Sequence, residues 1–351
     1  MDLETIAKLA KVSRSTVSRV INNHPHVSPA TRERVLEIIR KKNFQPNLAA
    51  RGLAKGHTRV LGLVIPMSVP ALFTDPYFST FIQGVAAACN VHDHSVMLWL
   101  ADPEYERRTI RQILYSGLID GVIVASNLLD DPVVQALVES DFPFMMNGRH
   151  PGNDRVNYVD IDNIASAREA VSHLFRLGRR RIGTVTGPHN MIAGADRLLG
   201  YTLALRDRGQ AVDAELVVES DFTETGGYYA MQRLMAHQPD AVFVASDTMA
   251  VGVLQALREA GRRVPEDIAV VGFDDMPFAA RTLPPLTTIR QPIQRSGELA
   301  TETLIDMIQH PHAAPRRIIL PTELVVRASC GAAQNQKGGD PANIQNAYAT
   351  V

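Results

Sequence analysis

The stretch "KVSRSTVSRVINN", residues 11–23, decides the architecture of the first part of the chain. Ser13 is suited to begin a helix, because a serine hydroxyl accepts a hydrogen bond from a backbone N–H of the first turn. Val17, Val20 and Ile21 then follow at the spacing of one helical face. Polar side chains occupy the opposite face: Arg14, Ser15, Ser18, Arg19 and Asn22. The stretch therefore predicts an amphipathic helix that presents arginine, serine and asparagine to a partner.

A further helix is expected on each side of this one. Before it, Ile6, Leu9 and Ala10 lie at helical spacing. After it, Ser28 and Pro29 have the residue types of a cap and a first helical position. The apolar residues of this third helix are expected to face inward: Val35, Ile38 and Ile39. Two helices joined by a short turn, the second with a polar face, match a helix-turn-helix that reads the DNA major groove.

Charge is divided unevenly along the 351 residues. Residues 1–56 contain eleven Lys or Arg and four Asp or Glu, a net +7, whereas the rest of the chain carries a net −8. A small basic domain on an acidic body suggests a polyanion as partner of the basic domain. The alternative is a basic surface that is only solvated. Arg14 and Arg19 can donate forked hydrogen bonds to guanine or to phosphate, and short hydroxyl side chains let the backbone approach phosphates.

The longer stretch "TIAKLAKVSRSTVSRVINNHPHVSPATRERVLEIIRKKNFQPNLAARGLAKG", residues 5–56, resembles the N-terminal domain of the lactose-repressor/galactose-repressor family. The resemblance implies a helix-turn-helix DNA-binding domain over residues 1–46. It places Arg14 and Ser15 at variable base-reading positions and Arg19 at a third. It implies that further residues hold phosphates or fix the register: Thr5, Ser13, Thr16, Ser18 and Asn22. Lys11 departs from the glycine often found in the turn, at a cost of roughly 1 kcal/mol that the fold should tolerate.

A linker is expected over residues 47–58. Asn47 can cap a helix, but Gly52 weakens it and the segment is shorter than the roughly 12–15 residues that a helix needs alone in water. One interpretation is a flexible tether. The family resemblance implies a hinge helix instead, which forms on the operator beside the hinge of a second subunit. Ala50 would then let the two hinges touch, and Leu53 would enter the minor groove.

From Val60 onward, apolar strands such as "VLGLV", "GVIVAS" and "IAVVGF" alternate with amphipathic helices. Two successive series of such units predict two doubly wound parallel sheets. The fold class is thus an all-α helix-turn-helix head plus an α/β body, whose two lobes resemble periplasmic binding proteins. The chain is expected to change lobe near Asp160, Ile289 and Ile318. The expected ranges are 59–330 for the effector-binding and dimerisation domain, 60–159 and 290–316 for its N-lobe, 160–289 and 317–330 for its C-lobe, and 331–351 for a disordered tail.

Ligands of such folds bind beyond the carboxyl ends of the strands. The residues expected there are Asp75, Tyr77, Phe78, Arg149, Arg197, Phe222, Ser246, Asp274 and Gln291. Arginine and aspartate hydrogen-bond vicinal hydroxyls and aromatic rings cover apolar sugar faces, so a polyhydroxylated effector fits. The family resemblance implies effector contacts for Arg197, Asp274 and Gln291, and stacking for Phe78 and Phe222. We expect neighbouring residues to have structural roles: Asp247 as a helix cap, Asp275 in a turn, Trp99 in the core, and Asp160 and Asp162 at the lobe crossover.

Other classes of protein find little support. The sequence lacks a nucleophile elbow and a P-loop, and its histidines lack metal-ligand spacing, so neither an enzyme nor a metal or cofactor site is expected. Cys89 and Cys330 are isolated in the sequence, which favours a reducing cytoplasm. No apolar run is long enough to span a membrane, and no signal peptide begins the sequence. The tail lacks leucine heptads for a coiled coil.

These observations predict a homodimeric transcription regulator, a repressor, that binds double-stranded operator DNA with palindromic sequence. A small polyhydroxylated effector, a sugar or sugar derivative, is expected to control it from the cleft between the lobes. One alternative is a constitutive DNA-binding dimer without ligand control. Another is a solute-binding protein or enzyme whose basic head has no role, although the missing signal peptide and the +7 head argue against it.

Overall fold

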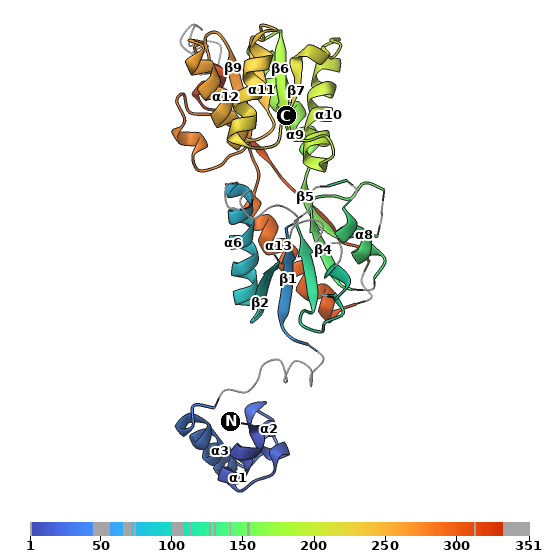
Figure 1. The fold of residues 1–351 in the computed structure, drawn as a ribbon, viewed down its shortest axis with the longest axis vertical. Coiled ribbons are helices and arrows are strands. Elements are labelled where there is room, and N and C mark those ends of the chain that lie inside the picture. Colours follow the sequence, from blue (N-terminus) through green and yellow to red (C-terminus); the bar gives the residue numbers. More distant parts are fainter. Residues whose placement is uncertain are drawn as a thin grey trace, which may run out of the picture. The chain divides into compact units, whose positions relative to one another are not determined.

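The computed structural model describes residues 2–44, 57–65, 72, 75–99, 109–112, 114–125, 128–129, 131–140, 142–152, 155–311 and 314–332. The chain divides between Arg59 and Val60 into two compact units (Figure 1). The smaller unit, the head, contains the three predicted helices: α1 (Leu3–Ala10), α2 (Arg14–Ile21) and α3 (Pro29–Lys41).

Each helix of the head begins at a capping side chain. Asp2, Ser13 and Ser28 accept hydrogen bonds from backbone N–H groups of α1, α2 and α3 respectively. Lys11 takes up the left-handed conformation expected in the turn, with φ of 52°, and its N–H bonds back to α1. The core holds Ile6, Ala7, Ala10, Val17, Val20, Val35 and Phe44.

Of the three residues that share helical spacing in α1, Ile6 and Ala10 are buried and Leu9 is 47% exposed. Ile6, Ala7 and Ala10 form the stripe that packs in the core of the head.

The larger unit, the body, contains two sheets, as predicted, and each has six strands among the described residues. The first has the strand order β11-β5-β4-β3-β1-β2 and the second β12-β10-β9-β8-β6-β7. Every pairing is parallel except that of β10 with the edge strand β12. The strands are β1 (Val60–Val64), β2 (Ser95–Trp99), β3 (Gly121–Val124), β4 (Phe144–Asn147), β5 (Tyr158–Ile161), β6 (Ile182–Thr186), β7 (Val217–Glu219), β8 (Ala241–Val244), β9 (Ala269–Asp274), β10 (Thr287–Arg290), β11 (Arg317–Leu320) and β12 (Glu323–Val325).

Helices cover both faces of each sheet, because successive residues of a buried strand point to opposite sides. In the first sheet, Leu61 and Leu63 pack against α6 and α13, whereas Val122 and Val124 pack against α8. In the second sheet, α11 and α12 cover one face and α9 and α10 the other (Figure 1). The helices are α6 (Pro76–Val91), α8 (Pro132–Val138), α9 (Asn163–Arg176), α10 (Ile192–Arg206), α11 (Glu224–Met235), α12 (Asp247–Glu259) and α13 (Ile293–Gln309), with 3-10 turns at Ala214–Leu216, Ala279–Arg281 and Ala328–Cys330.

The chain passes between the lobes three times, after β5, after β10 and after β11. The first two passages lie close to the expected positions. The third comes later than expected, because β11 pairs in parallel with β5 and so belongs to the first sheet. The expected boundary at residue 317 assigned this strand to the C-lobe, and only β12 enters the second sheet.

Candidate functional site

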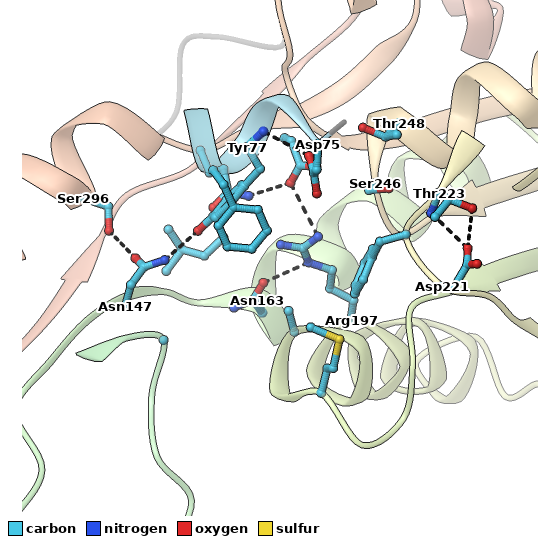
Figure 2. Close-up of a pocket in the computed structure, with 18 of the residues that line it drawn as sticks. Asp75, Tyr77, Asn147, Asn163, Arg197, Asp221, Thr223, Ser246, Thr248 and Ser296 are labelled. Atoms are coloured by element: carbon cyan, nitrogen blue, oxygen red, sulfur yellow. Dashed lines mark hydrogen bonds and ion pairs between the residues drawn. The ribbon is translucent and has the colours of Figure 1, made fainter. Parts of the chain in front are cut away.

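A cavity of about 780 Å³ lies where the carboxyl ends of the two sheets meet (Figure 2). Its walls come from the first residues of α6, the end of β4 and the start of α13 on one side, and from α10, α11, α12 and β9 on the other. The polar and aromatic side chains lining it include Asp75, Tyr77, Phe78, Asn147, Asp160, Asn163, Arg197, Asp221, Phe222, Thr223, Glu224, Thr225, Ser246, Thr248, Asp274, Gln291 and Ser296. This volume is within the range of about 300–1,000 Å³ of small-molecule sites.

Arg197 is the buried cation of the cavity. It lies in the second turn of α10 and is only 5% exposed. Its Nε donates to Asn163 Oδ1 at 2.9 Å (Figure 2). Its Nη1 donates to the carbonyl oxygen of Ala245 at 2.6 Å. Nη1 also lies 3.5 Å from Asp274 Oδ1, and the guanidinium stacks 3.7 Å from the ring centre of Phe273. These contacts fix the guanidinium plane against the floor of the cavity.

Carboxylates surround this arginine. Asp274 ends β9 and accepts a 2.5 Å hydrogen bond from Nε2 of Gln291. Burial raises the pKa of Asp274 to about 7, with Arg197 opposing that rise and the charge of Asp75 adding to it. Burial also raises the pKa of Asp75, which caps α6 by accepting the N–H of Tyr77, and raises that of Asp160 to about 6. Arg197 therefore compensates only part of the negative charge that these buried carboxyl groups carry when ionised.

On the side of the first lobe, uncharged side chains that hydrogen-bond one another line the cavity. Ser296 Oγ donates to Asn147 Oδ1 at 2.7 Å, and Asn147 Nδ2 donates to the hydroxyl of Tyr77 at 2.9 Å (Figure 2). Burial raises the pKa of the Tyr77 phenol, so this group stays protonated and is available to donate. The wall thus offers an uncharged hydroxyl in a fixed orientation to a ligand.

Two phenylalanine side chains line the cavity, in addition to Tyr77. Phe78 is 5% exposed and packs with the core of the first lobe. Phe222 has a φ of 65°, a left-handed conformation that is costly for an aromatic residue. Its ring lies over Gly187, where an added Cβ would be 2.0 Å from the ring. Gly187 therefore makes room for the ring at the mouth of the cavity.

Eight of the nine residues expected at this site line the cavity: Asp75, Tyr77, Phe78, Arg197, Phe222, Ser246, Asp274 and Gln291. Arg149 does not. Its guanidinium makes two hydrogen bonds to the carboxylate of Asp196, from Nε at 2.8 Å and from Nη2 at 2.5 Å. The position of Arg149 after a strand predicted where its backbone lies. It did not predict the orientation of the long side chain, which a two-bonded carboxylate partner determines.

Some residues near the site have other roles than expected. Ser246, not Asp247, caps α12 by accepting the N–H of Met249. Asp247 is fully buried and accepts hydrogen bonds from the Thr288 hydroxyl and from the N–H of Met276. Asp275, which was expected only as a turn residue, also forms ion pairs with Arg290 and Arg327.

Sequence reasoning missed Asn147, Asn163 and Ser296. Asn147 ends β4 and the strand-end rule would have found it, whereas Ser296 lies inside α13 and carries no such signal.

The head holds a second candidate site on α2. Arg14, Ser15, Arg19 and Asn22 are exposed, whereas Val17 and Val20 are buried. Hydroxyl side chains at the start of the helix hydrogen-bond one another: Ser13 Oγ lies 2.7 Å from Ser15 Oγ and 2.9 Å from Thr16 Oγ1.

Other expected DNA contacts of the head also bond within it. Asn22 Nδ2 donates to Ser18 Oγ at 3.4 Å, and the Thr5 hydroxyl donates to Asp2. Asn47, Ala50, Leu53 and most of the expected tail lie outside the described residues.

Within the described ranges, no three or more His, Cys, Asp or Glu side chains are grouped as metal ligands. None of the described helices combines the length and apolar character that crossing a membrane requires.

Comparison with known proteins agrees with this geometry. Residues 2–47 match the family model "Bacterial regulatory proteins, lacI family", and residues 171–330 match "Periplasmic binding protein-like domain". The chain is 41% identical over 331 residues to the HTH-type transcriptional regulator CelR of Thermobifida fusca, covering 93% of this chain and 97% of that protein.

Two solved structures are similar over nearly the whole chain. A complex of the transcriptional regulator CelR with cellobiose is 40% identical with a TM-score of 0.75, covering 94% of this chain and 99% of that one. The Lac repressor dimer bound to operator and the anti-inducer ONPF is 26% identical with a TM-score of 0.84, at the same coverage. The chain therefore belongs to the LacI family of bacterial regulatory proteins and is a DNA-binding transcription regulator, not an enzyme.

Proposed function

We propose that this regulator is a cytoplasmic homodimeric repressor that binds a palindromic operator and responds to a sugar bound between its lobes. The buried network of Arg197, Asp274 and Gln291 carries this proposal, because it places a fixed donor and a fixed acceptor side by side in a cavity of ligand size. Such a pair matches two vicinal hydroxyls, and the rings of Phe78 and Phe222 match the apolar face of a pyranose.

Cellobiose is the first effector to test. The relative CelR, 40% identical along most of the chain, has been solved with cellobiose. A cavity of about 780 Å³ has room for two sugar rings within the size range of ligand sites. Hydroxyl side chains among its lining residues can hydrogen-bond a second ring: Thr223, Thr225, Ser246 and Thr248.

DNA reading is proposed for the exposed face of α2, with Arg14, Ser15 and Arg19 at the bases. Thr5, Ser13, Thr16, Ser18 and Asn22 would hold phosphates or the register. Residues 47–58 are proposed as a hinge that orders on the operator, with Asn47 as cap, Ala50 at the contact between hinges and Leu53 in the minor groove. Sugar binding between the lobes would then act on DNA affinity through the geometry of the paired hinges.

The test is selection of bound DNA from a random pool by the purified protein, repeated with added cellobiose. We expect a palindrome whose retention falls when the sugar is present. Arg14→Ala should change the preferred base at one position in each half-site, whereas Ser18→Ala should weaken all sequences alike. A selected site that is unchanged in Arg14→Ala would contradict the base-reading assignment.

The ligand half of the proposal has its own variants. Arg197→Ala should abolish the response to sugar and leave operator affinity intact. Loss of both together would indicate misfolding, which circular dichroism checks. Operator binding that ignores every sugar tested would favour the alternative, a constitutive DNA-binding dimer without ligand control.

A further inference from the structure

Most of the charged side chains that line the cavity are acidic. Among the described lining residues, Arg197 is the only Lys or Arg side chain. Five carboxylates share the lining with it: Asp75, Asp160, Asp221, Glu224 and Asp274. Asp274 alone engages the arginine at 3.5 Å, so the remaining acidic groups add negative potential without a cation of their own in the lining.

A second arginine is close by but is held away from the cavity. Arg149 follows the lining residue Gly148, and its N–H donates to the lining carboxylate of Asp160 at 2.8 Å. Its guanidinium nevertheless binds Asp196 through two hydrogen bonds, in a pair whose acidic side chain is only 6% exposed. Asp196 immediately precedes Arg197 in α10. The same turn of this helix therefore carries Arg197, which lines the cavity, and Asp196, which binds Arg149 outside it.

We infer that the cavity accepts uncharged polyols and excludes sugar phosphates and sugar acids, and that Asp196 is a positioning residue for this selectivity because it keeps the Arg149 guanidinium out of the cavity. The inference deepens the proposed function and rests on it, since it concerns the effector of the same site. The hydrogen-bonded pair of Arg149 and Asp196 thus keeps a second positive charge out of a cavity whose lining is already mostly acidic.

The physical reason is the repulsion between a ligand anion and fixed carboxylates in a partly desolvated site. Two unit charges about 4 Å apart interact by several kcal/mol at the effective dielectric constant near a protein surface. A phosphate at physiological pH carries between one and two negative charges. It would meet Asp75, Asp160 and Asp274 with a single guanidinium to balance them. Uncharged hydroxyls avoid this repulsion, and carboxylate acceptors favour them.

The test measures direct binding by titration calorimetry with the full-length protein, at pH 7.5. The probes are cellobiose, cellobiose 6′-phosphate, glucose, glucose 6-phosphate and gluconate. We expect the phosphorylated form of the sugar that binds to have a Kd at least tenfold higher than the parent sugar. A phosphate that binds as tightly as its parent, or more tightly, would overturn the charge inference and leave the proposal of a sugar effector standing.

The role of Asp196 has a separate arm. Asp196→Asn should release Arg149 and so lower, at least threefold, the ratio of the Kd of the phosphorylated sugar to the Kd of its parent sugar. The double variant Arg149→Met, Asp196→Asn should restore the original ratio. A purely structural effect would weaken both ligands alike and leave the ratio unchanged, which would overturn the role of Asp196. Asp207→Asn is the matched control: it breaks the Arg168–Asp207 ion pair at the far end of α10, whose partners are 50% and 40% exposed.

The two proposals fail differently. If neither the parent sugars nor the anionic forms bind, and operator retention ignores all of them, the sugar-effector proposal is overturned together with this inference. If only anionic sugars bind and release the operator, the effector proposal survives and the inference is wrong.

Discussion

Asp274 is the residue whose ionisation most affects both the fold and the cavity. It ends β9 with a φ of 118°, is 6% exposed, and has its pKa raised to about 7 chiefly by burial. Between about pH 4 and pH 7, the folded state therefore binds a proton at this carboxyl that the unfolded state has released. Stability contributed by the protonated form is present at low pH and is lost as the pH rises through this window.

The prediction concerns Asp274→Asn, which keeps the shape and the tolerance of positive φ but removes the charge. We expect the free energy of unfolding at pH 8 to increase by about 1 to 3 kcal/mol, and the gain to shrink toward pH 5. Urea unfolding at the two pH values measures it, and calorimetry should show the loss of sugar binding in the same variant. A variant that is less stable than the parent protein at pH 8 would mean that the carboxylate is needed for its contacts with Gln291 and Arg197.

At the scale of single residues, the sequence predicts the backbone position of a residue better than the partner that its side chain binds. The strand-end rule located Asp274 and Gln291 because it depends only on the backbone. It failed for Arg149, whose long side chain reaches Asp196, forty-seven residues later, across a distance that no local pattern encodes. Ser296 was missed for the related reason that it enters the cavity from the start of a helix, where serine has no distinctive spacing.

Among the elements, the packing of α6 against α13 holds the first lobe together and supports the wall of the cavity. The two helices approach closely because each has a glycine at the contact. A Cβ added at Gly84 would lie 2.0 Å from the carbonyl oxygen of Gln294, and one added at Gly297 would lie 2.4 Å from that of Phe81. Backbone atoms cannot move aside as a flexible side chain can, so the helices would have to separate.

We therefore predict that Gly84→Ala lowers the free energy of unfolding by about 1 to 3 kcal/mol. The gain in helix propensity from glycine to alanine, about 1 kcal/mol, acts in the opposite direction. Ala87→Gly is the control, because position 87 is exposed on the same helix and should lose only that propensity. Thermal unfolding followed by circular dichroism compares them. A stable Gly84→Ala variant with unchanged sugar affinity would show that the helices have room to separate.

The elements themselves were largely predictable. Alternating runs of buried and amphipathic residues predicted the two sheets, and the caps Ser13 and Ser28 predicted the starts of α2 and α3. β11 was assigned to the wrong lobe because short edge strands look alike in sequence, and pairing with β5 rather than β10 is decided by the path of the chain. Helical spacing alone grouped the exposed Leu9 with the buried Ile6 and Ala10, because neighbouring stripes of a helix differ by one residue.

On the scale of the whole molecule, DNA binding and the proposed effector binding use opposite electrostatics. The first 56 residues carry a net +7 and present Arg14 and Arg19 on an exposed helix face. The remainder carries a net −8, and five of the six charged side chains among the described residues that line its cavity are carboxylates. DNA binding is therefore expected to depend on neutralising phosphates, and effector binding on uncharged hydrogen bonds.

This division predicts a sharp difference in response to salt. Binding that neutralises six to ten phosphates weakens by about 10³- to 10⁵-fold between 50 and 200 mM salt, because condensed counterions are released. We expect the operator affinity of the protein to weaken by a factor within that range, whereas the Kd of an uncharged sugar should change less than twofold. Fluorescence anisotropy with labelled operator and calorimetry with cellobiose, in the same buffers, measure the two. A sugar Kd that rises steeply with salt would mean that the effector is an anion, and an operator affinity that barely changes would mean that the basic residues of the head contact few phosphates.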